Sequence, residues 1–358
     1  MKRWIQAMSA EQPHTRNLTY EEAREAAADM TSGASTDAQC AAFLMALCMK
    51  GEALEETKAF IDVFRSQAVV YNAVQDSLNS AGPAEGRQTF PVTLPVSLLL
   101  ASVGFKQVMH GGTSFTTRQG TVMKELLEGL GVATTVPIKG WQAMLQQVHI
   151  GFLSTEQLCP PIGRLKGVRE QLGLRTVIDT VEKVLNPVSS TNVILGVHPR
   201  KAMEPLIPIA MHSGFQQTYL VSGIEGSEDL PLYASSLIRI VTPWGDETRV
   251  MDPQKFGFRS EPLPALSRDE QIDLIRRIIA GDESSEVKRE RDHVIFNAGL
   301  RFMWFEKVGS YEEGFQLAEA LLKRKEANKV MQRWVDRSQH YARQQQPPDG
   351  GDAPAKIG

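Results

Sequence analysis

The chain has 358 residues, of which 42% are hydrophobic and 23% are charged, and its formal net charge is −3. This length is enough for two domains. The small negative net charge excludes the strongly basic overall composition that is typical of nucleic-acid-binding proteins. No apolar run approaches the roughly 18–20 residues that cross a bilayer, so we expect no membrane partner. The N-terminal segment lacks the apolar core of a secretory signal, and the three cysteines are too scattered for a disulfide framework. We therefore expect a cytoplasmic protein.

Residues 18–67 have the pattern of three short helices. Thr19 and Glu22 have the spacing of a capping box, and Gly33 is placed to end the helix that they begin. A second helix follows and is predicted to end at Gly51. Because this region has little strand potential, the sequence predicts a small all-α domain at the N-terminus.

From about residue 71 onward, strand patterns alternate with helix patterns. An apolar helix is expected to begin near Thr93, because Pro91 and Pro95 disfavour an earlier regular start. Residues 79–86 are predicted to form a glycine-containing loop. The predicted strands are Gln107–Met109, Gly151–Leu153, Thr191–Gly196, Thr218–Ser222 and Ser236–Val241. This alternation predicts an α/β fold with a central, mostly parallel sheet flanked by helices.

These patterns divide the chain into two domains and a tail. The helical domain comprises residues 1–72 and a helical insertion at about residues 155–188. The α/β domain comprises residues 73–154 and 189–330. Residues 331–358 are interpreted as the basic end of the last helix followed by a polar, Pro- and Gly-rich tail, which is predicted to be disordered.

The segment GFKQVMHGGTSFTTRQGTVMKELLEGLG, residues 104–131, combines a short strand, a loop of glycines and hydroxyl groups, and the start of a helix. Small donors between a strand and a helix N-terminus are a common way to bind phosphate in α/β proteins. An inherited turn without any ligand is the alternative. The candidate phosphate-binding or ligand-binding residues of this segment are His110, Gly111, Ser114, Thr117, Arg118 and Gly120.

Five segments, in the same order along about residues 18–334, resemble the anthranilate phosphoribosyltransferase family, which has the nucleoside phosphorylase type of fold. The segment above is one of them. The others are EEAREAAADMTSGASTDAQCAAFLMALCMKGEALEE, GVREQLGLRTVIDTVEKVLNPV, GVHPRKAMEPLIPIAMHSGFQQTYLVSG and RDHVIFNAGLRFMWFEKVGSYEEGFQLAEALL. The resemblance implies a homodimer formed through the helical domain. It also implies phosphoribosyl pyrophosphate as a ligand and Mg²⁺ as a cofactor when that ligand is bound.

The motifs that bind phosphoribosyl pyrophosphate in this family are altered here. The family's G-T-G-G-D loop corresponds to residues 79–86, where Gly82 remains a candidate phosphate ligand but Pro83 lacks a backbone donor and Glu85 adds a carboxylate. The Mg²⁺-coordinating serine of the N-x-S-T segment corresponds to Thr93.

The acidic pair that holds metal ions in the family has a reversed counterpart in Glu228-Asp229. With Thr93, these two residues are the candidate metal ligands; a surface turn is the alternative for the pair. Arg169 matches an arginine associated with the family's anthranilate pocket. The Cys159-Pro160-Pro161 sequence resembles paralogues outside the tryptophan pathway, which keep the fold and dimer, lack transferase activity and bind nucleic acid.

Two stretches, residues 164–183 and the end of the last helix at residues 323–337, are locally basic. They are either solvated helix faces or surfaces that follow a phosphate backbone.

Three hypotheses for the function remain. The first is a divergent family member that binds nucleic acid or a phosphorylated ligand. The second is an active, Mg²⁺-dependent anthranilate phosphoribosyltransferase of tryptophan biosynthesis. The third is a non-catalytic, dimeric interaction module.

Overall fold

The computed structural model describes residues 1–9, 16–69, 71, 74, 76–82, 86–112, 120–197 and 203–344. Its N-terminal region is helical, as predicted, and consists of α1 (Lys2–Ser9), α2 (Tyr20–Thr31), α3 (Asp37–Lys50) and α4 (Leu54–Ser66). The predicted capping box is present, because the Thr19 side chain accepts from the Glu22 amide while the Glu22 side chain accepts from the Thr19 amide. Helix α1 was not predicted.

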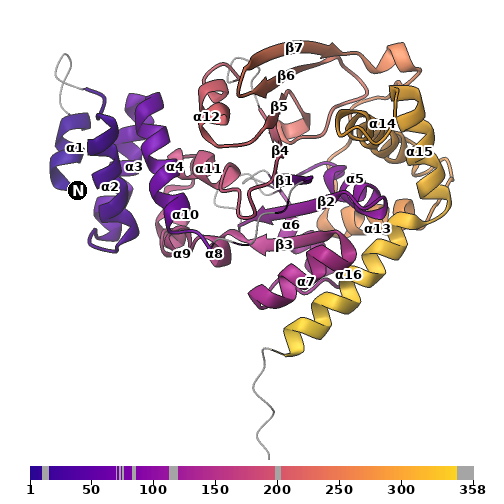
Figure 1. Ribbon diagram of the computed structural model, residues 1–358, viewed down its shortest axis with the longest axis horizontal. Helices are drawn as coiled ribbons and strands as arrows, with labels where there is room; N and C mark the ends of the chain where they lie inside the picture. The colour runs from indigo at the N-terminus through magenta and orange to yellow at the C-terminus, as the bar shows by residue number, and fades with distance from the viewer. Residues whose placement is uncertain are drawn as a thin grey trace, which may run out of the picture.

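A seven-stranded sheet forms the centre of the larger part of the molecule (Figure 1). Its strand order is β3-β2-β1-β4-β5-β6-β7. The strands are β1 (Ser77–Ala81), β2 (Lys106–Gly111), β3 (Ile150–Ser154), β4 (Asn192–Gly196), β5 (Gln217–Val221), β6 (Ser236–Thr242) and β7 (Gly245–Met251). The first five are parallel, and β6 and β7 are antiparallel additions at one edge. The predicted fold class is therefore confirmed.

Strand β1 corrects the prediction of a loop over residues 79–86. Asn79, Ser80 and Ala81 are poor strand formers, yet they belong to β1, which pairs with both β2 and β4 at the centre of the sheet. The chain leaves the sheet only at Gly82. Strand β7 was also missed, because most of its residues are exposed and it lacks the apolar pattern of a core strand.

Helices cover both sides of the sheet. Helix α5 (Thr93–Ser102) begins where the prolines predicted and is buried from Thr93 to Ala101, because it lies between the sheet and the helices α14 and α16. The other helices are α6 (Met123–Gly129), α7 (Ile138–Val148), α8 (Thr155–Leu158), α9 (Pro160–Arg164), α10 (Lys166–Leu172), α11 (Val177–Lys183), α12 (Leu206–His212), α13 (Arg268–Ile279), α14 (Lys288–Trp304), α15 (Tyr311–Lys323) and α16 (Glu326–Arg343).

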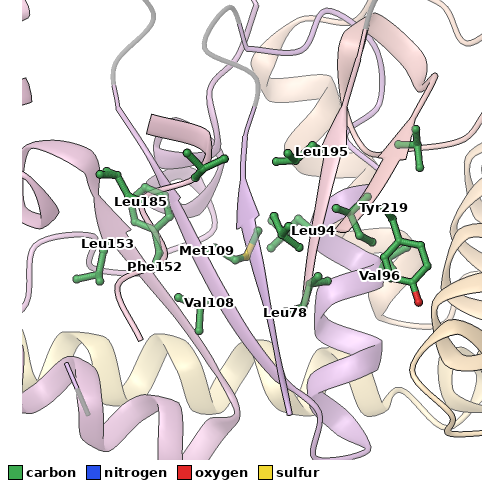
Figure 2. Packing of buried hydrophobic residues seen from close by; sticks show 14 of the residues in the cluster. Leu78, Leu94, Val96, Val108, Met109, Phe152, Leu153, Leu185, Leu195 and Tyr219 are labelled. Carbon is green, nitrogen blue, oxygen red and sulfur yellow. The ribbon is translucent and has the colours of Figure 1, made fainter. Parts of the chain in front are cut away.

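The core continues from the sheet into these helices. Figure 2 shows Leu94 of α5 with Leu78 of β1, Met109 of β2 and Tyr219 of β5, all of them buried members of one apolar cluster. Tyr219 extends this layer to α14 by stacking on Trp304 at a centroid separation of 4.8 Å. Burial of this apolar surface supplies the main stabilisation of the fold and fixes the strand ends that carry the candidate site.

Helices α8 to α11 lie between the N-terminal helices and the sheet (Figure 1). Helix α9 contacts α2, α10 contacts α3, and α11 contacts α3, α4 and β1. The predicted assignment of residues 155–188 to the helical domain, with its boundaries, stays a prediction. No helix in the described part of the chain has the length and apolar character to span a membrane. The tail predicted to be disordered lies, beyond Gln344, outside the described residues.

Candidate functional site

The candidate site lies at the carboxyl ends of β1 and β2. Gly82 follows β1 directly, and its amide donates to the carbonyl oxygen of His110 at 3.3 Å. His110 and Gly111 are the last two residues of β2. Gly120 precedes α6 on the far side of the predicted phosphate loop. The structure thus brings Gly82, His110 and Gly111 to one edge, while the candidates Ser114, Thr117 and Arg118 lie outside the described residues.

Two segments that follow these strands are tied together across the edge. The backbones of Arg87 and Thr121 exchange hydrogen bonds of 2.9 Å in both directions. Gly86 has a φ of +69°, and a Cβ there would lie 2.4 Å from the carbonyl oxygen of Gly120. Only glycine fits this approach without a shift of the backbone. The contact between Gly86 and Gly120 fixes the backbone position from which the Arg87 side chain extends into the buried interior.

Asp229 occupies the centre of a buried cluster behind this edge. Its Oδ2 accepts from Nη1 of Arg87 at 2.7 Å and from the backbone amide of Thr93 at 3.1 Å. Its Oδ1 accepts from the Thr93 hydroxyl at 2.9 Å and from Nη2 of Arg301 at 3.3 Å. The Asp229 side chain is fully buried, so both oxygens are satisfied by four donors, two of which are guanidinium groups.

Glu228, its neighbour, is held in a different way. Its Oε1 accepts from the Ser80 hydroxyl at 2.5 Å, and its nearest approach to Arg301 is 3.9 Å. Burial raises the pKa of Glu228 to about 7, and the adjacent Asp229 charge acts in the same direction. The proton is therefore retained well above the ordinary range of a glutamate.

The predicted metal ligands Thr93, Glu228 and Asp229 thus lie together but do not suit a magnesium ion. Mg²⁺ requires several free oxygen donors in octahedral geometry, whereas both Asp229 oxygens and the Thr93 hydroxyl already bond to each other or to arginine. Within the described residues, no group of three or more His, Cys, Asp or Glu side chains is arranged to hold a metal ion.

A small internal cavity of 20 Å³ remains beside this cluster, between Thr93, Arg87 and His110. It has room for about one water molecule. His110 is fully buried, and neither of its ring nitrogens has a hydrogen-bond partner among the described residues. Burial lowers the pKa of His110 to about 4, so the imidazole is neutral near pH 7.

Arg169, the residue that the resemblance connects with the anthranilate pocket, is also engaged. It lies buried in α10 and pairs with Asp179 at 3.1 Å and with Glu182 at 2.9 Å. The Thr155 hydroxyl donates to the other oxygen of Glu182. Two carboxylates of the same chain therefore already compensate the charge of this guanidinium.

A larger cavity, of 390 Å³, lies between α4, α11, β4 and α12 and was not predicted. Its polar side includes Asp179 and Lys183, and its apolar side includes Leu195 and Ile209. The Lys183 ammonium donates to the carbonyl oxygen of Gly196 at 3.3 Å, and burial lowers the pKa of Lys183. This volume suits a small organic ligand.

Three residues of the buried cluster were missed by the sequence reasoning. Arg87, Arg301 and Ser80 contact the acidic pair across 142, 72 and 148 residues of sequence, respectively. Neither a motif nor a helical or strand period relates positions so far apart. Cys159 packs inside the protein, because it is buried and its Sγ donates to the Phe64 carbonyl oxygen at 3.5 Å.

Comparison with known families agrees with this architecture. A model described as "Glycosyl transferase family, a/b domain" matches residues 76–328. A second, described as "Glycosyl transferase family, helical bundle domain", matches residues 10–68. The chain therefore belongs to this glycosyl transferase family.

Several individual relatives are anthranilate phosphoribosyltransferases. The anthranilate phosphoribosyltransferase of Geobacter sulfurreducens is 29% identical over 84% of this chain and 90% of the relative. That of Petrotoga mobilis is 25% identical over 89% of this chain and 93% of the relative.

Solved structures agree in fold. The anthranilate phosphoribosyltransferase of Thermus thermophilus is 26% identical, has a TM-score of 0.79 and covers 95% of this chain and 100% of its own. The Saccharomyces cerevisiae enzyme in complex with phosphoribosyl pyrophosphate and Mg is 17% identical, with a TM-score of 0.81 over 95% of this chain and 98% of its own. At that identity the yeast structure supports the fold alone.

Proposed function

We propose that this chain is a phosphoribosyltransferase of the anthranilate type. The observation that carries the proposal is the match to relatives of that name across 89% and 84% of this chain. The position of Gly82, His110 and Gly111 at the carboxyl edge of the parallel strands supports it, because this edge is where α/β sheets bind ligands.

The proposed reaction breaks the bond between C1 of the ribose and the pyrophosphate oxygen. Pyrophosphate leaves with the bonding electrons, and the amino nitrogen of anthranilate bonds to C1 and loses a proton. Backbone amides beside Gly111 and Gly120 are suited to the departing phosphates. Any magnesium in this scheme belongs to the phosphates of the substrate, since the oxygens of Asp229 are already satisfied.

A second candidate function, nucleic-acid binding without transfer, is favoured by the outer face of α16. Lys329, Arg333 and Arg337 recur at every fourth position, so they share one exposed face of the helix, and Arg343 continues the charge toward its end. Among the described residues, Arg337 and Arg343 pair with no carboxylate. Lys329 pairs with Glu326 at 2.8 Å, so the arginines carry the unneutralised charge of this face. Such cations attract a phosphate backbone in a salt-dependent manner.

Two titrations of the wild-type protein separate these functions. Phosphoribosyl pyrophosphate with Mg²⁺ is titrated by calorimetry and turnover is followed by the loss of anthranilate fluorescence. Labelled single-stranded DNA is titrated by anisotropy at about 50 mM and about 200 mM salt. Turnover supports the transferase, whereas salt-sensitive DNA binding without turnover contradicts it and supports the second candidate. If the protein shows neither turnover nor DNA binding, the dimeric interaction module is the remaining hypothesis.

We also propose that the protein is a homodimer formed through α3. Met45 and Met49 on this helix are 37% and 79% exposed, and Ala42 and Cys48 are exposed beside them. These positions form one apolar stripe at helical spacing. The same stripe on a second copy of the chain could bury this surface, since contiguous apolar surface on a helix commonly marks an interface.

A further inference from the structure

We infer that Arg87 is a built-in cation that takes the place of a divalent metal ion at the acidic pair. This inference concerns how the chain neutralises Asp229 and Glu228, and it holds whether or not the proposed transfer reaction occurs. Its basis is the hydrogen-bond pattern of the buried cluster, in which a guanidinium lies where the carboxylates would otherwise face a free cation.

The Arg87 guanidinium is bound on every side by oxygen. Nη1 donates to Asp229 at 2.7 Å and to the Ser227 hydroxyl, and Nε donates to Glu225 at 3.2 Å. Nη2 donates to the Thr89 hydroxyl at 3.0 Å and to the Phe90 carbonyl oxygen at 3.3 Å. An arginine with all three nitrogens engaged and a side chain only 5% exposed is a structural part of the cluster.

The acidic pair is neutralised by arginine side chains without a metal ion. Asp229 contacts two guanidiniums, those of Arg87 and Arg301, while the Glu228 carboxyl accepts from the Ser80 hydroxyl and lies 3.9 Å from Arg301. A divalent ion would add two positive charges to a buried site in which both Asp229 oxygens are already satisfied, so it would first have to displace Arg87 to reach them. The 20 Å³ cavity beside Thr93 does not accommodate both cations and their waters.

The backbone holds Arg87 in this place independently of its side chain. The Arg87 carbonyl oxygen accepts from the Thr121 amide and from Nε2 of Gln271, both at 2.9 Å. Gln271 also donates to the Thr89 carbonyl oxygen at 3.1 Å. Removal of the guanidinium is therefore expected to free one side of Oδ2 of Asp229 for a cation while these backbone contacts remain.

The test uses Mn²⁺ as the probe and follows the free-ion electron paramagnetic resonance signal during titration into the full chain. We expect the wild-type protein to bind Mn²⁺ at least tenfold more weakly than the Arg87→Ala variant. The Arg87→Ala/Asp229→Asn double variant is expected to lose the added site. Arg337→Ala, which removes an exposed arginine, is the matched control and is expected to behave as wild type.

One tight Mn²⁺ per wild-type chain that disappears in Asp229→Asn would overturn the inference, and so would the absence of any gain in a folded Arg87→Ala chain. Arg87→Gln, whose amide can still donate to Asp229, replaces Arg87→Ala if the latter does not fold. The wild-type titration decides the first outcome by itself. Because the readout is metal binding, a failure of the proposed transferase activity does not affect it.

Discussion

Arg87 and Asp229 are 142 residues apart in sequence, yet Nη1 of Arg87 lies 2.7 Å from Oδ2 of Asp229 inside the protein. This pair joins the segment after β1 to the segment after β5, and Thr93 at the start of α5 bonds to the same carboxylate. Together with Thr93, the pair connects three separate parts of the carboxyl edge of the sheet. Loss of the pair is therefore expected to lower both the stability of the fold and the affinity for a ligand at this edge.

Replacement of Arg87 by methionine is expected to lower the free energy of unfolding by about 3–5 kcal/mol, because it leaves a buried carboxylate without its main partner. Urea denaturation followed by circular dichroism measures this change. The matched control is Arg24→Met, which breaks the exposed pair with Glu21 and should cost less than about 1 kcal/mol. Equal losses in the two variants would contradict a structural role for the buried pair.

His110 should make the protein sensitive to acid. Its folded-state pKa of about 4 lies below its ordinary value of 6.5, so the unfolded chain binds the proton first as the pH falls. The free energy of unfolding is unaffected above pH 6.5 and decreases toward pH 4, by up to about 3 kcal/mol. The measurement is urea denaturation at several pH values for wild type and His110→Gln. A variant with an unchanged slope in this window would show that His110 is not buried as a neutral group.

Gly86→Ala should destabilise the protein more than Gly33→Ala. Both glycines have positive φ, of +69° and +79°, so an alanine is strained in either place and costs about 1 kcal/mol. Only Gly86 faces the Gly120 backbone, where the new Cβ would lie 2.4 Å from an oxygen, and we expect about 2 kcal/mol more there. Thermal unfolding of the two variants tests this, and equal shifts would argue against the close approach.

Met49→Lys is expected to shift the protein from dimer to monomer, because it places a charge in the apolar stripe of α3. Sedimentation velocity at two protein concentrations measures the change. Val250→Lys is the control, since Val250 is 66% exposed on β7, far along the chain from α3. A dimer that survives Met49→Lys, or a monomeric wild type, would remove α3 as the interface.

Charge reversal on α16 tests the second candidate function. Arg333→Glu/Arg337→Glu is expected to weaken binding of single-stranded DNA by tenfold or more and to reduce its salt dependence, because two phosphate contacts are lost. Anisotropy at two salt concentrations provides the measurement. Lys288→Glu, on the exposed start of α14, is the control. Unchanged DNA affinity in the double variant would exclude this face as the binding surface.

Local sequence patterns predicted much of the fold. The capping pair Thr19 and Glu22 located the start of α2, and Pro91 located the start of α5, because caps and prolines act within a single turn of helix. The apolar run of β2 located the strand that precedes the phosphate-loop segment. These features depend on neighbours in the chain, so they can be read from the sequence.

The candidate site could be predicted only in part, and the limit is physical. The sequence by itself determined that Thr93, His110, Glu228 and Asp229 belong to segments of a phosphoribosyltransferase type of fold, because each lies in a recognisable local motif. Only the tertiary structure decided that residues 79–81 form a central strand, since their weak strand propensity is overridden by pairing with β2 and β4. The partner of Asp229 was decided in the same way. A buried charge takes whichever opposite charge the packed core brings within hydrogen-bond reach, and packing placed Arg87 there from across the chain.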